Sequence, residues 1–337
     1  RMSPHTFVIK VSPKAPQKKL ILTAAEVLRR GGLVAFPTET VYGLGADALN
    51  ANAVKQIFVA KGRPLDNPII VHIASASDLN TLTDHVPEEA RELMDKFWPG
   101  PLTLIFSKSA NVPDAVTGGM ATVAVRMPQN KIALALIKAL GHPIAAPSAN
   151  LSGRPSGTTA GHVLHDFVEK IEMIIDGGPV TVGVESTVLD LSRKPPAILR
   201  PGAVTQEDLT PILGRVVMGT TAEMKRRSPG TRYRHYSPKA QVTLVEPNDE
   251  KAIANLIERR NQEGKRTALV TRNPGSRKDA GVITKVMSQD LKEYARQIFA
   301  VLRELDEQAV DEIIIEKIEE KGIGVAIMDR LKRAAAR

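Results

Sequence analysis

Two short segments of the sequence combine residue types that bind phosphate. The first, Lys61-Gly62-Arg63-Pro64 followed by Asp66-Asn67, places two cations in a loop after a predicted helix. Arg presents a planar fork of donors and Lys a mobile point charge, so together they could hold a polyphosphate. The alternative is a solvated loop whose positive charges are stabilised by the helix C-terminus. Taken alone, this segment favours the second interpretation.

The second segment follows the predicted strand 144–146. It contains Pro147-Ser148-Ala149-Asn150 and Ser152-Gly153-Arg154-Pro155-Ser156-Gly157. Small residues let a ligand approach the backbone closely, and hydroxyl, amide and backbone N–H groups can bind phosphate oxygens or the water shell of Mg²⁺. The alternative is an ordinary turn, because Ser, Asn and Gly are common turn residues.

A third segment, Arg232-Tyr233-Arg234-His235-Tyr236, alternates cations with aromatic rings. Such a pattern could stack on a base and hold phosphates, or it could be a soluble tether. Among single residues, His72 lies within an apolar strand, a position more typical of a buried core histidine. Arg126 ends a strand of small residues, where it could extend to solvent.

Composition limits the chemistry that the chain can perform. The 337 residues contain no cysteine, which excludes disulfides, thiolate zinc sites and cysteine nucleophiles. The sequence has no run of about 18 apolar residues and no apolar signal segment at its start, so we expect a cytoplasmic protein without a membrane partner. The net charge is +9, but residues 215–240 hold seven Lys or Arg and one acid, so the excess lies mainly in one segment.

Two common nucleotide-binding motifs are not supported. Gly43-Leu44-Gly45-Ala46-Asp47-Ala48 fits G-x-G-x-x-A, but six residues separate it from the preceding strand and no acid ends the next strand. A nicotinamide-dependent dehydrogenase would rest on this weak match alone. The sequence contains no G-x-x-x-x-G-K-[ST], which excludes a P-loop enzyme.

The elements that position these residues alternate irregularly in the first two thirds of the chain, which favours a mixed sheet over a parallel one. The Gly31-Gly32 pair ends the first predicted helix, and a polar, Gly-bearing loop is expected over 37–45. The predicted helices cover 20–30, 51–60, 87–97 and 130–140, and the predicted strands cover 33–36, 69–73, 102–107, 122–126, 144–146, 173–176, 187–191 and 197–200.

The last third of the chain has a simpler pattern. Residues 205–240, rich in Gly, Pro, Thr and Arg, indicate a linker, so we expect domains at 1–204 and 241–337. The second domain should be a small α/β unit of a common size. Its predicted strands cover 241–246, 266–271, 281–286 and 311–316, and its predicted helices cover 249–263, 289–305 and 323–335.

Several motifs in order resemble the YrdC family, in its long two-domain form of L-threonylcarbamoyladenylate synthase. They are Phe36 to Gly45, Lys61-Gly62-Arg63, Trp98-Pro99-Gly100-Pro101-Leu102-Thr103, Ser148-Ala149-Asn150 and Arg200-Pro201-Gly202. The Lys-x-Arg and Ser-x-Asn pairs are the signature of that family. The resemblance covers roughly residues 15–205, and the segment 228–238 and the following domain are similar to the longer members. It implies a twisted mixed-sheet α/β domain with a basic cavity and a smaller Rossmann-like α/β domain.

The resemblance also implies a reaction. L-threonine, bicarbonate or CO2, and ATP with Mg²⁺ would give L-threonylcarbamoyladenylate and pyrophosphate. A separate complex would then transfer the threonylcarbamoyl group to the adenosine beside the anticodon of a tRNA, and direct contact with tRNA is possible. The Mg²⁺ ion would be held mainly by ATP phosphates, with no protein ligand assigned.

The resemblance assigns individual residues to each substrate. Lys61 and Arg63 would be catalytic. Arg126 would pair with the carboxylate of threonine. The threonine set is Thr40, His72, Arg126, Ala146 and Ser186, and the ATP set is Lys61, Arg63, Asn67, Thr122, Ser148, Asn150, Ser156, Arg200 and Tyr236. Because Tyr236 lies in the linker, we expect residues 228–238 to fold over the active site as a lid that excludes water.

Two further alternatives remain. A non-catalytic RNA-binding module would use the basic segment and would show RNA affinity with a steep dependence on salt. A YrdC-like domain also occurs in carbamoyl transfer during hydrogenase cofactor assembly, but that architecture carries cysteine-rich zinc modules, and this chain has none. The sequence leaves open the role of the second domain, the oligomeric state and the preference for threonine over serine.

Overall fold

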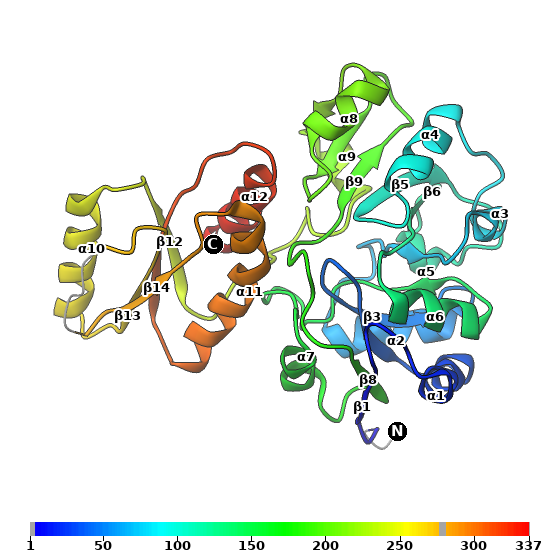
Figure 1. Cartoon of the computed structure of the whole chain (residues 1–337), viewed down its shortest axis with the longest axis horizontal. Coiled ribbons are helices and arrows are strands. Elements are labelled where there is room, and N and C mark those ends of the chain that lie inside the picture. The colour runs from blue at the N-terminus through cyan, green and yellow to red at the C-terminus, as the bar shows by residue number, and fades with distance from the viewer. Residues whose placement is uncertain (1–3, 276–280, 337) are drawn as a thin grey trace. The chain divides into compact units, whose positions relative to one another are not determined.

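The computed structural model describes residues 4–275 and 281–336. It divides into two compact units. The first comprises Arg1–Ser152 and Ser156–Tyr233, and the second comprises Gly153–Pro155 and Arg234–Arg337. Figure 1 shows the elements of both units in chain order.

The first unit is built on a mixed sheet of eleven strands in the order β1-β8-β2-β3-β7-β4-β6-β5-β9-β10-β11. Parallel pairs such as β4 with β6 alternate with antiparallel pairs such as β5 with β6, which confirms the predicted mixed sheet. The strands are β1 (Phe7–Lys10), β2 (Val34–Pro37), β3 (Tyr42–Asp47), β4 (Val71–His72), β5 (Leu102–Ser107), β6 (Thr122–Arg126), β7 (Ile144–Ala145), β8 (Met173–Asp176), β9 (Thr187–Asp190), β10 (Ala197–Arg200) and β11 (Val217–Met218).

Helices α1 (Lys18–Arg29) and α6 (Lys131–Leu140) pack together on this sheet. Their apolar residues recur every three or four positions, so each helix presents one apolar face. Those faces form a buried cluster with Phe36 of β2 and Ile175 of β8. A larger cluster includes α2 (Ala51–Lys61), α4 (Glu88–Phe97) and α7 (Ala160–Phe167). The shorter helices are η1 (Ala76–Asp78), α3 (Leu79–Leu82), α5 (Asp114–Thr117), α8 (Gln206–Leu213) and α9 (Ala222–Arg226).

Helix α2 determines where the first cationic pair lies. The Asn50 side chain caps its start by accepting the Ala53 N–H at 3.0 Å. Gly62 ends it in the left-handed conformation, with φ of 61°, which glycine adopts without the strain of a Cβ. Lys61 is therefore the last helical residue and Arg63 is the first residue beyond the cap.

The prediction of a loop over 37–45 is wrong in its second half. Residues Tyr42–Asp47 form β3, a fully buried strand that pairs antiparallel with β2. Its glycines are needed for packing rather than for flexibility, because a Cβ on Gly45 would lie 2.7 Å from the Phe36 ring and 2.9 Å from Ile144. The alternating Tyr42, Leu44 and Ala46 enter the core on the other face.

Residues 205–240, expected to be a linker, contain α8, β11 and α9, and the first unit extends to Tyr233. A capping box starts α8, in which Thr205 and Asp208 each bind the backbone N–H of the other. The division into 1–204, 205–240 and 241–337 stays a prediction. The other predicted helices and strands are present, with ends that differ by up to two residues.

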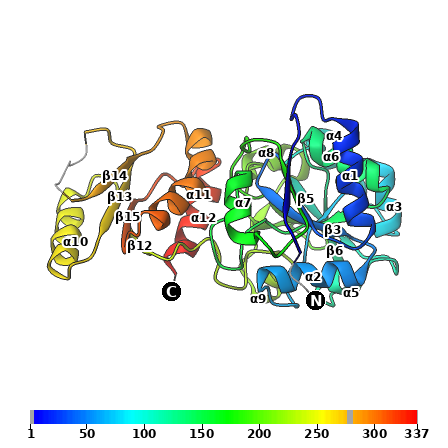
Figure 2. The ribbon, with the colours of Figure 1, turned by 90° about the horizontal axis from the view of Figure 1, so that it is seen from below.

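The second unit has a four-stranded parallel sheet in the order β12-β15-β13-β14. Its strands are β12 (Gln241–Val245), β13 (Thr267–Thr271), β14 (Ile283–Val286) and β15 (Glu312–Glu316), and its helices are α10 (Glu250–Gln262), α11 (Leu291–Glu307) and α12 (Gly324–Ala335). Ile253 and Ile257 of α10 pack on Leu269 and Ile314 of the sheet. Figure 2 shows α10 on one face of this sheet and α11 and α12 on the other.

Within the described part of the chain, none of the helices has the length and hydropathy needed to span a membrane.

Candidate active site

Three neighbouring strands of the first unit bring predicted threonine-site residues near one another: β4 and β6 end at His72 and Arg126, and the antiparallel β7 begins beside them. His72 of β4 pairs in register with Arg126 of β6 and with Ile144 of β7. Ala146 follows β7 directly, and its N–H donates to the Ile70 carbonyl at 3.0 Å. The fourth residue, Thr40, lies in the turn between β2 and β3 and accepts a hydrogen bond from Arg126 Nη1 at 2.9 Å.

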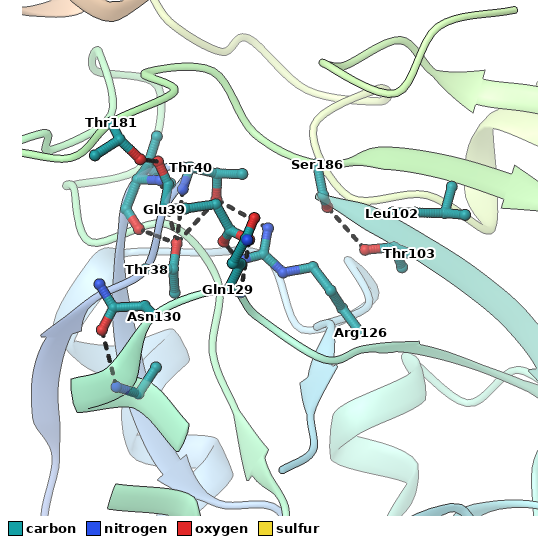
Figure 3. Close-up of polar contacts among 12 residues, drawn as sticks. Thr38, Glu39, Thr40, Leu102, Thr103, Arg126, Gln129, Asn130, Thr181 and Ser186 are labelled. Carbon is teal, nitrogen blue, oxygen red and sulfur yellow. Dashed lines mark hydrogen bonds and ion pairs between the residues drawn. The ribbon is translucent and has the colours of Figure 1, made fainter. Parts of the chain in front are cut away.

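Arg126 is held by an ion pair that the sequence analysis did not assign. Its Nη2 lies 2.8 Å from Oε1 of Glu39, and both side chains are buried, at 2% and 5% exposed. Figure 3 shows Arg126 extending from its strand toward Glu39 and Thr40. A buried arginine requires an anion, but the sequence alone does not show that Arg126 is buried, so nothing pointed to Glu39 although it lies within the motif Phe36 to Gly45.

Glu39 is itself fixed from several directions. Its Oε2 accepts the Gln129 N–H at 2.7 Å, and its backbone carbonyl accepts the N–H groups of Val182 at 2.8 Å and Thr181 at 3.2 Å. Thr38 and Thr40 hydroxyls lie 2.9 Å apart beside it. These bonds fix the direction of the Arg126 guanidinium before any ligand arrives.

The guanidinium keeps capacity for a ligand. It has five N–H donors, and the hydrogen bonds to Thr40 and Glu39 use two of them. Its Nε has no hydrogen-bond partner among the described residues. Burial lowers the pKa of Arg126 below its ordinary value, against the opposing effect of Glu39. An added carboxylate would stabilise this buried cation, so the arrangement suits an anionic ligand.

His72 lies beside Arg126 as a neutral ring. Burial, and then the charge of Arg126, lower the pKa of His72 to about 3. Its Nδ1 is buried and has no hydrogen-bond partner in the part of the chain that the structure describes. A neutral imidazole can donate through one nitrogen and accept through the other, so His72 can bind a polar group without adding charge.

Ser186 joins a second group of predicted residues. Its hydroxyl lies 2.7 Å from that of Thr103 and accepts Arg200 Nη2 at 3.1 Å, while its carbonyl accepts Arg200 Nε at 3.0 Å. The preceding residue, Glu185, accepts a short hydrogen bond from the Ser156 hydroxyl. The predicted threonine residue Ser186 therefore contacts one predicted ATP residue, Arg200, and its neighbour Glu185 contacts another, Ser156.

The two signature pairs also meet. Lys61 is buried, and its ammonium donates to the Asn150 carbonyl at 2.6 Å and, in a shorter contact, to the Ser148 carbonyl. The Lys61 carbonyl in turn accepts the Ser152 N–H at 2.9 Å. A chain of 87 residues separates Lys61 from Ser148, so only the fold brings them together.

The loop after Lys61 contacts the basic segment. Arg63 Nη2 donates to the Pro68 carbonyl at 2.8 Å, which curves the loop around buried Asn67. Asp66 pairs with Arg232 at 2.9 Å and accepts the Tyr233 hydroxyl at 2.5 Å. The hydrogen bond from Tyr233 is the main cause that lowers the pKa of Asp66. Arg232 and Tyr233, the first two residues of the segment that alternates cations with aromatic rings, are therefore bound to the loop that carries Arg63.

Two predicted ATP residues lie elsewhere. Thr122 begins β6, four residues before Arg126, which places it at the opposite end of that strand. Tyr236 belongs to the second unit, where its ring stacks on Phe299 with centroids 5.5 Å apart and lies under the Arg330 guanidinium. The contacts of Thr122 and Tyr236 with ATP, and the lid over 228–238, stay predictions.

Among residues 4–275 and 281–336, no group of three or more His, Asp or Glu side chains is arranged to hold a metal ion.

Comparison with known proteins covers both units. Residues 26–202 match the Sua5_yciO_yrdC family, described as Telomere recombination. Residues 204–336 match the family described as Threonylcarbamoyl-AMP synthase, C-terminal domain. The threonylcarbamoyl-AMP synthase of Pyrococcus abyssi is 49% identical over 98% of both chains. That of Bacillus subtilis is 46% identical over 94% of this chain and 92% of the relative.

Solved structures share the fold of this chain over all or part of its length. The crystal structure of P. abyssi Sua5 complexed with L-threonine has a TM-score of 0.92 at 48% identity, covering 98% of this chain and 97% of that one. Escherichia coli YciO has a TM-score of 0.53 at 30% identity and covers 59% of this chain and 96% of its own. The fold and the site thus define a YrdC-like enzyme with a second α/β domain, as the sequence predicted. The chain belongs to the threonylcarbamoyl-AMP synthase family.

Proposed function

We propose that this chain condenses L-threonine, bicarbonate or CO2, and ATP into L-threonylcarbamoyladenylate, and releases pyrophosphate. The observation that carries this proposal is the buried Arg126, oriented by Glu39 and Thr40 beside neutral His72. An oriented buried cation next to neutral hydrogen-bonding groups suits a small zwitterion with a hydroxyl group. The P. abyssi relative with the same fold is described in complex with L-threonine.

Threonine would bind through its carboxylate to Arg126, using donors that Glu39 and Thr40 leave available. The hydroxyls of Thr40 and Ser186 and the ring of His72 offer further hydrogen bonds to the amino acid. Ala146 lies next to them at the end of β7 and would contact the substrate with its backbone. Because His72 carries no charge at neutral pH, it would not repel the threonine ammonium.

ATP would bind beside this group. Lys61 and Arg63 supply positive charge for the triphosphate, and the loop that carries Ser148 and Asn150 is already fixed on Lys61. Asn67 lies on the loop that carries Arg63, and Ser156 lies on the loop that carries Asn150. Arg200 at the end of β10 and Thr122 complete the proposed set. Mg²⁺ would be held mainly by the phosphates, since phosphate-bound Mg²⁺ usually keeps several waters and needs few protein ligands.

The chemistry requires positioning more than covalent assistance. The ammonium of threonine first loses a proton to solvent, and the free amine then adds to CO2 and releases a second proton to give the carbamate. One oxygen of the carbamate then attacks the α-phosphorus of ATP. The bond to pyrophosphate breaks in the same displacement. Holding such short-lived reactants in line can contribute about 7–11 kcal/mol. Lys61 and Arg63 would stabilise the charge that develops on the departing pyrophosphate.

A relative that matches less than half of this chain supports assigning the chemistry to one unit, and all predicted site residues except Tyr236 lie in the first unit. The threonylcarbamoyl-AMP synthase of Halorhodospira halophila is 38% identical over 154 residues, which are 46% of this chain and 81% of that protein. The product would pass to a separate complex that modifies the adenosine next to the anticodon of a tRNA. We propose a cytoplasmic location because ATP, threonine and tRNA meet there.

The deciding experiment measures pyrophosphate release from ATP with Mg²⁺, with and without L-threonine and bicarbonate. We expect release only when both are present. Lys61→Ala and Arg63→Ala should each lower turnover by about 10²-fold or more, since each removes a charge that acts on the transition state. The exposed Lys18→Ala is the matched control and should retain full activity.

Two results would contradict the proposal. One is an absence of pyrophosphate release together with tight, salt-sensitive RNA binding, which would indicate a binding module. The other is release that does not depend on threonine, which would leave the adenylyl transfer but remove the assigned substrate.

A further inference from the structure

A separate polar cavity lies in the second unit, at the carboxyl ends of its parallel strands. It has a volume of about 310 Å³ and is lined by residues that follow β12, β13 and β15, together with Tyr294 of α11. Ligands of open α/β sheets bind in the crevice at this edge. The cavity volume is at the lower end of the range for small-molecule sites, about 300–1,000 Å³.

The floor of the cavity is a buried carboxylate. Glu316, the last residue of β15, is 8% exposed. Its Oε1 accepts the Asn248 N–H at 2.8 Å, and its Oε2 accepts a short hydrogen bond from the Thr271 hydroxyl. Asn248 donates this N–H from a left-handed conformation, with φ of 60°. A carboxylate offers about four acceptor positions, so Glu316 keeps capacity for a further donor.

Tyr294 supplies an unused hydroxyl next to this carboxylate. The side chain is 1% exposed, and its hydroxyl has no hydrogen-bond partner among residues 4–275 and 281–336. Burial raises the pKa of Tyr294 above its ordinary value, and the nearby charges of Arg272 and Glu316 act on it in opposite directions. A buried phenol without a partner is costly, and a ligand in the cavity would satisfy it.

Two cations line the cavity. Arg272 bonds to Glu319 at 2.6 Å and Lys317 bonds to Glu246, but these acceptors are 53% and 66% exposed. Ion pairs with exposed partners contribute little to the stability of the fold. Either cation can therefore exchange its partner for a ligand anion at a small cost in free energy. The Nε of Arg272 is buried and also has no hydrogen-bond partner within the described residues.

We propose that this cavity binds a small zwitterion of the α-amino acid class. The ligand carboxylate would accept from Tyr294, Arg272 and Lys317, and its ammonium would donate to Glu316. One buried anion beside two exchangeable cations matches opposite charges a few ångströms apart on one small molecule. This site does not rest on the catalytic function proposed for the first unit.

A phosphate ligand fits this edge less well. The helices α10 and α11 begin here, but aspartate side chains already cap both of them, Asp249 accepting from Ala252 and Asp290 accepting from Lys292. The carboxylates of Asp249, Asp290 and Glu316 would repel a phosphate, because like charges at short range are destabilising.

The experiment is hydrogen–deuterium exchange of the full chain with each standard L-amino acid at millimolar concentration. We expect at least one of them to protect peptides that contain residues 245–248, 271–275 and 314–317. Tyr294→Phe and Arg272→Gln should each raise the ligand concentration needed for half-maximal protection about tenfold or more. This is the effect expected when a hydrogen bond to a charged group is lost. Thr267→Val is the matched control, since its hydroxyl is also buried and unpartnered but lies at the other end of β13.

Three results would overturn the proposal. They are a lack of protection by every amino acid, protection by inorganic phosphate or AMP instead, and protection that survives both substitutions. Pyrophosphate release by the same samples reports on the first unit, so a failure here is distinguishable from a failure of the proposed function.

Discussion

At the scale of single residues, the site depends on how Arg126 is oriented. Glu39 and Thr40 hold two of its donors, and neighbouring backbone N–H groups hold Glu39. A buried ion pair adds little net stability compared with an apolar pair, but removing one partner leaves an uncompensated charge. Glu39 is therefore a positioning residue whose loss should be visible in both stability and substrate binding.

We predict that Glu39→Gln lowers the free energy of unfolding by about 3 kcal/mol, because Arg126 then remains buried without its anion. The KM for threonine should rise about tenfold while the KM for ATP changes little. Urea unfolding and steady-state kinetics measure the two effects. Glu89→Gln is the matched control, since Glu89 pairs with Lys194 at the surface and should cost less than about 1 kcal/mol. Equal changes in both KM values would argue against a role in orientation.

His72 predicts a dependence of stability on pH. Its pKa is lowered to about 3 in the folded chain, so between that value and its ordinary pKa of about 6.5 the unfolded chain binds more protons. The free energy of unfolding should therefore fall as the pH drops below about 6.5, with a limiting slope of about 1.4 kcal/mol per pH unit for one group. Denaturant titrations at several pH values measure this slope.

His72→Gln should reduce that slope, and the exposed His85→Gln serves as the control. A wild-type slope that persists in His72→Gln would place the responsible group elsewhere.

At the scale of elements, the strands and long helices could be predicted because their apolar residues follow regular periods. The loop predicted over 37–45 was wrong for its second half, because Gly43 and Gly45 are typical loop residues. Only the structure shows that they are glycines because the Phe36 ring packs against them in β3. The first strand and the short helices α8 and α9 were missed for a similar reason. Strand β1, for example, forms through backbone pairing with β8 while most of its side chains stay exposed, so no apolar pattern marks it in the sequence.

In the candidate site, too, residues within sequence motifs could be predicted and a residue that depends on tertiary contacts could not. Lys61, Ser148 and Asn150 were assigned to ATP from their motifs. The structure shows in addition that Lys61 contacts the other two residues, while their contacts with ATP stay predictions. Glu39 was missed, because nothing local in the sequence shows that Arg126 is buried beside it. A buried ion pair is a property of tertiary structure, and its two members lie 87 residues apart.

Gly202 shows how an element end positions a binding residue. A Cβ at this position would lie 2.3 Å from the Thr187 nitrogen and 2.7 Å from the Glu185 carbonyl. Gly202→Ala should therefore push the backbone that carries Ser186, lowering stability by about 1–3 kcal/mol and raising the KM for threonine. Thermal unfolding and kinetics measure both. Gly161→Ala in α7, with its nearest neighbour at 3.7 Å, should be tolerated, and equal effects of the two changes would refute the steric argument.

At the scale of the whole molecule, the positive charge is distributed unevenly along the chain. Residues 215–240 carry seven cations and one acid, and five of the cations are exposed, Arg215 and Arg226 among them. We predict that the double variant Arg215→Gln, Arg226→Gln weakens tRNA binding and reduces the salt slope by about 1.8, or 0.9 per lost phosphate contact. Filter binding over a salt series measures the slope.

Pyrophosphate release by this double variant should stay unchanged, because neither arginine belongs to the proposed site. Lys18→Gln, Lys19→Gln removes the same charge from α1 and is the control for net charge alone. An equal loss of tRNA affinity in both double variants would mean that overall charge, rather than this segment, attracts RNA.

The Lys61 ammonium binds the loop 147–157 through the main-chain oxygens of Ser148 and Asn150. Because every amino acid has the same backbone carbonyl, the contact with Lys61 does not restrict which residues occupy these two positions. The spacing between them is not free, because inserting or deleting one residue would move a carbonyl out of reach. Relatives of this chain should therefore keep the length of this loop, and any restriction on the identity of Ser148 and Asn150 must come from their own side chains, as in the proposed binding of ATP.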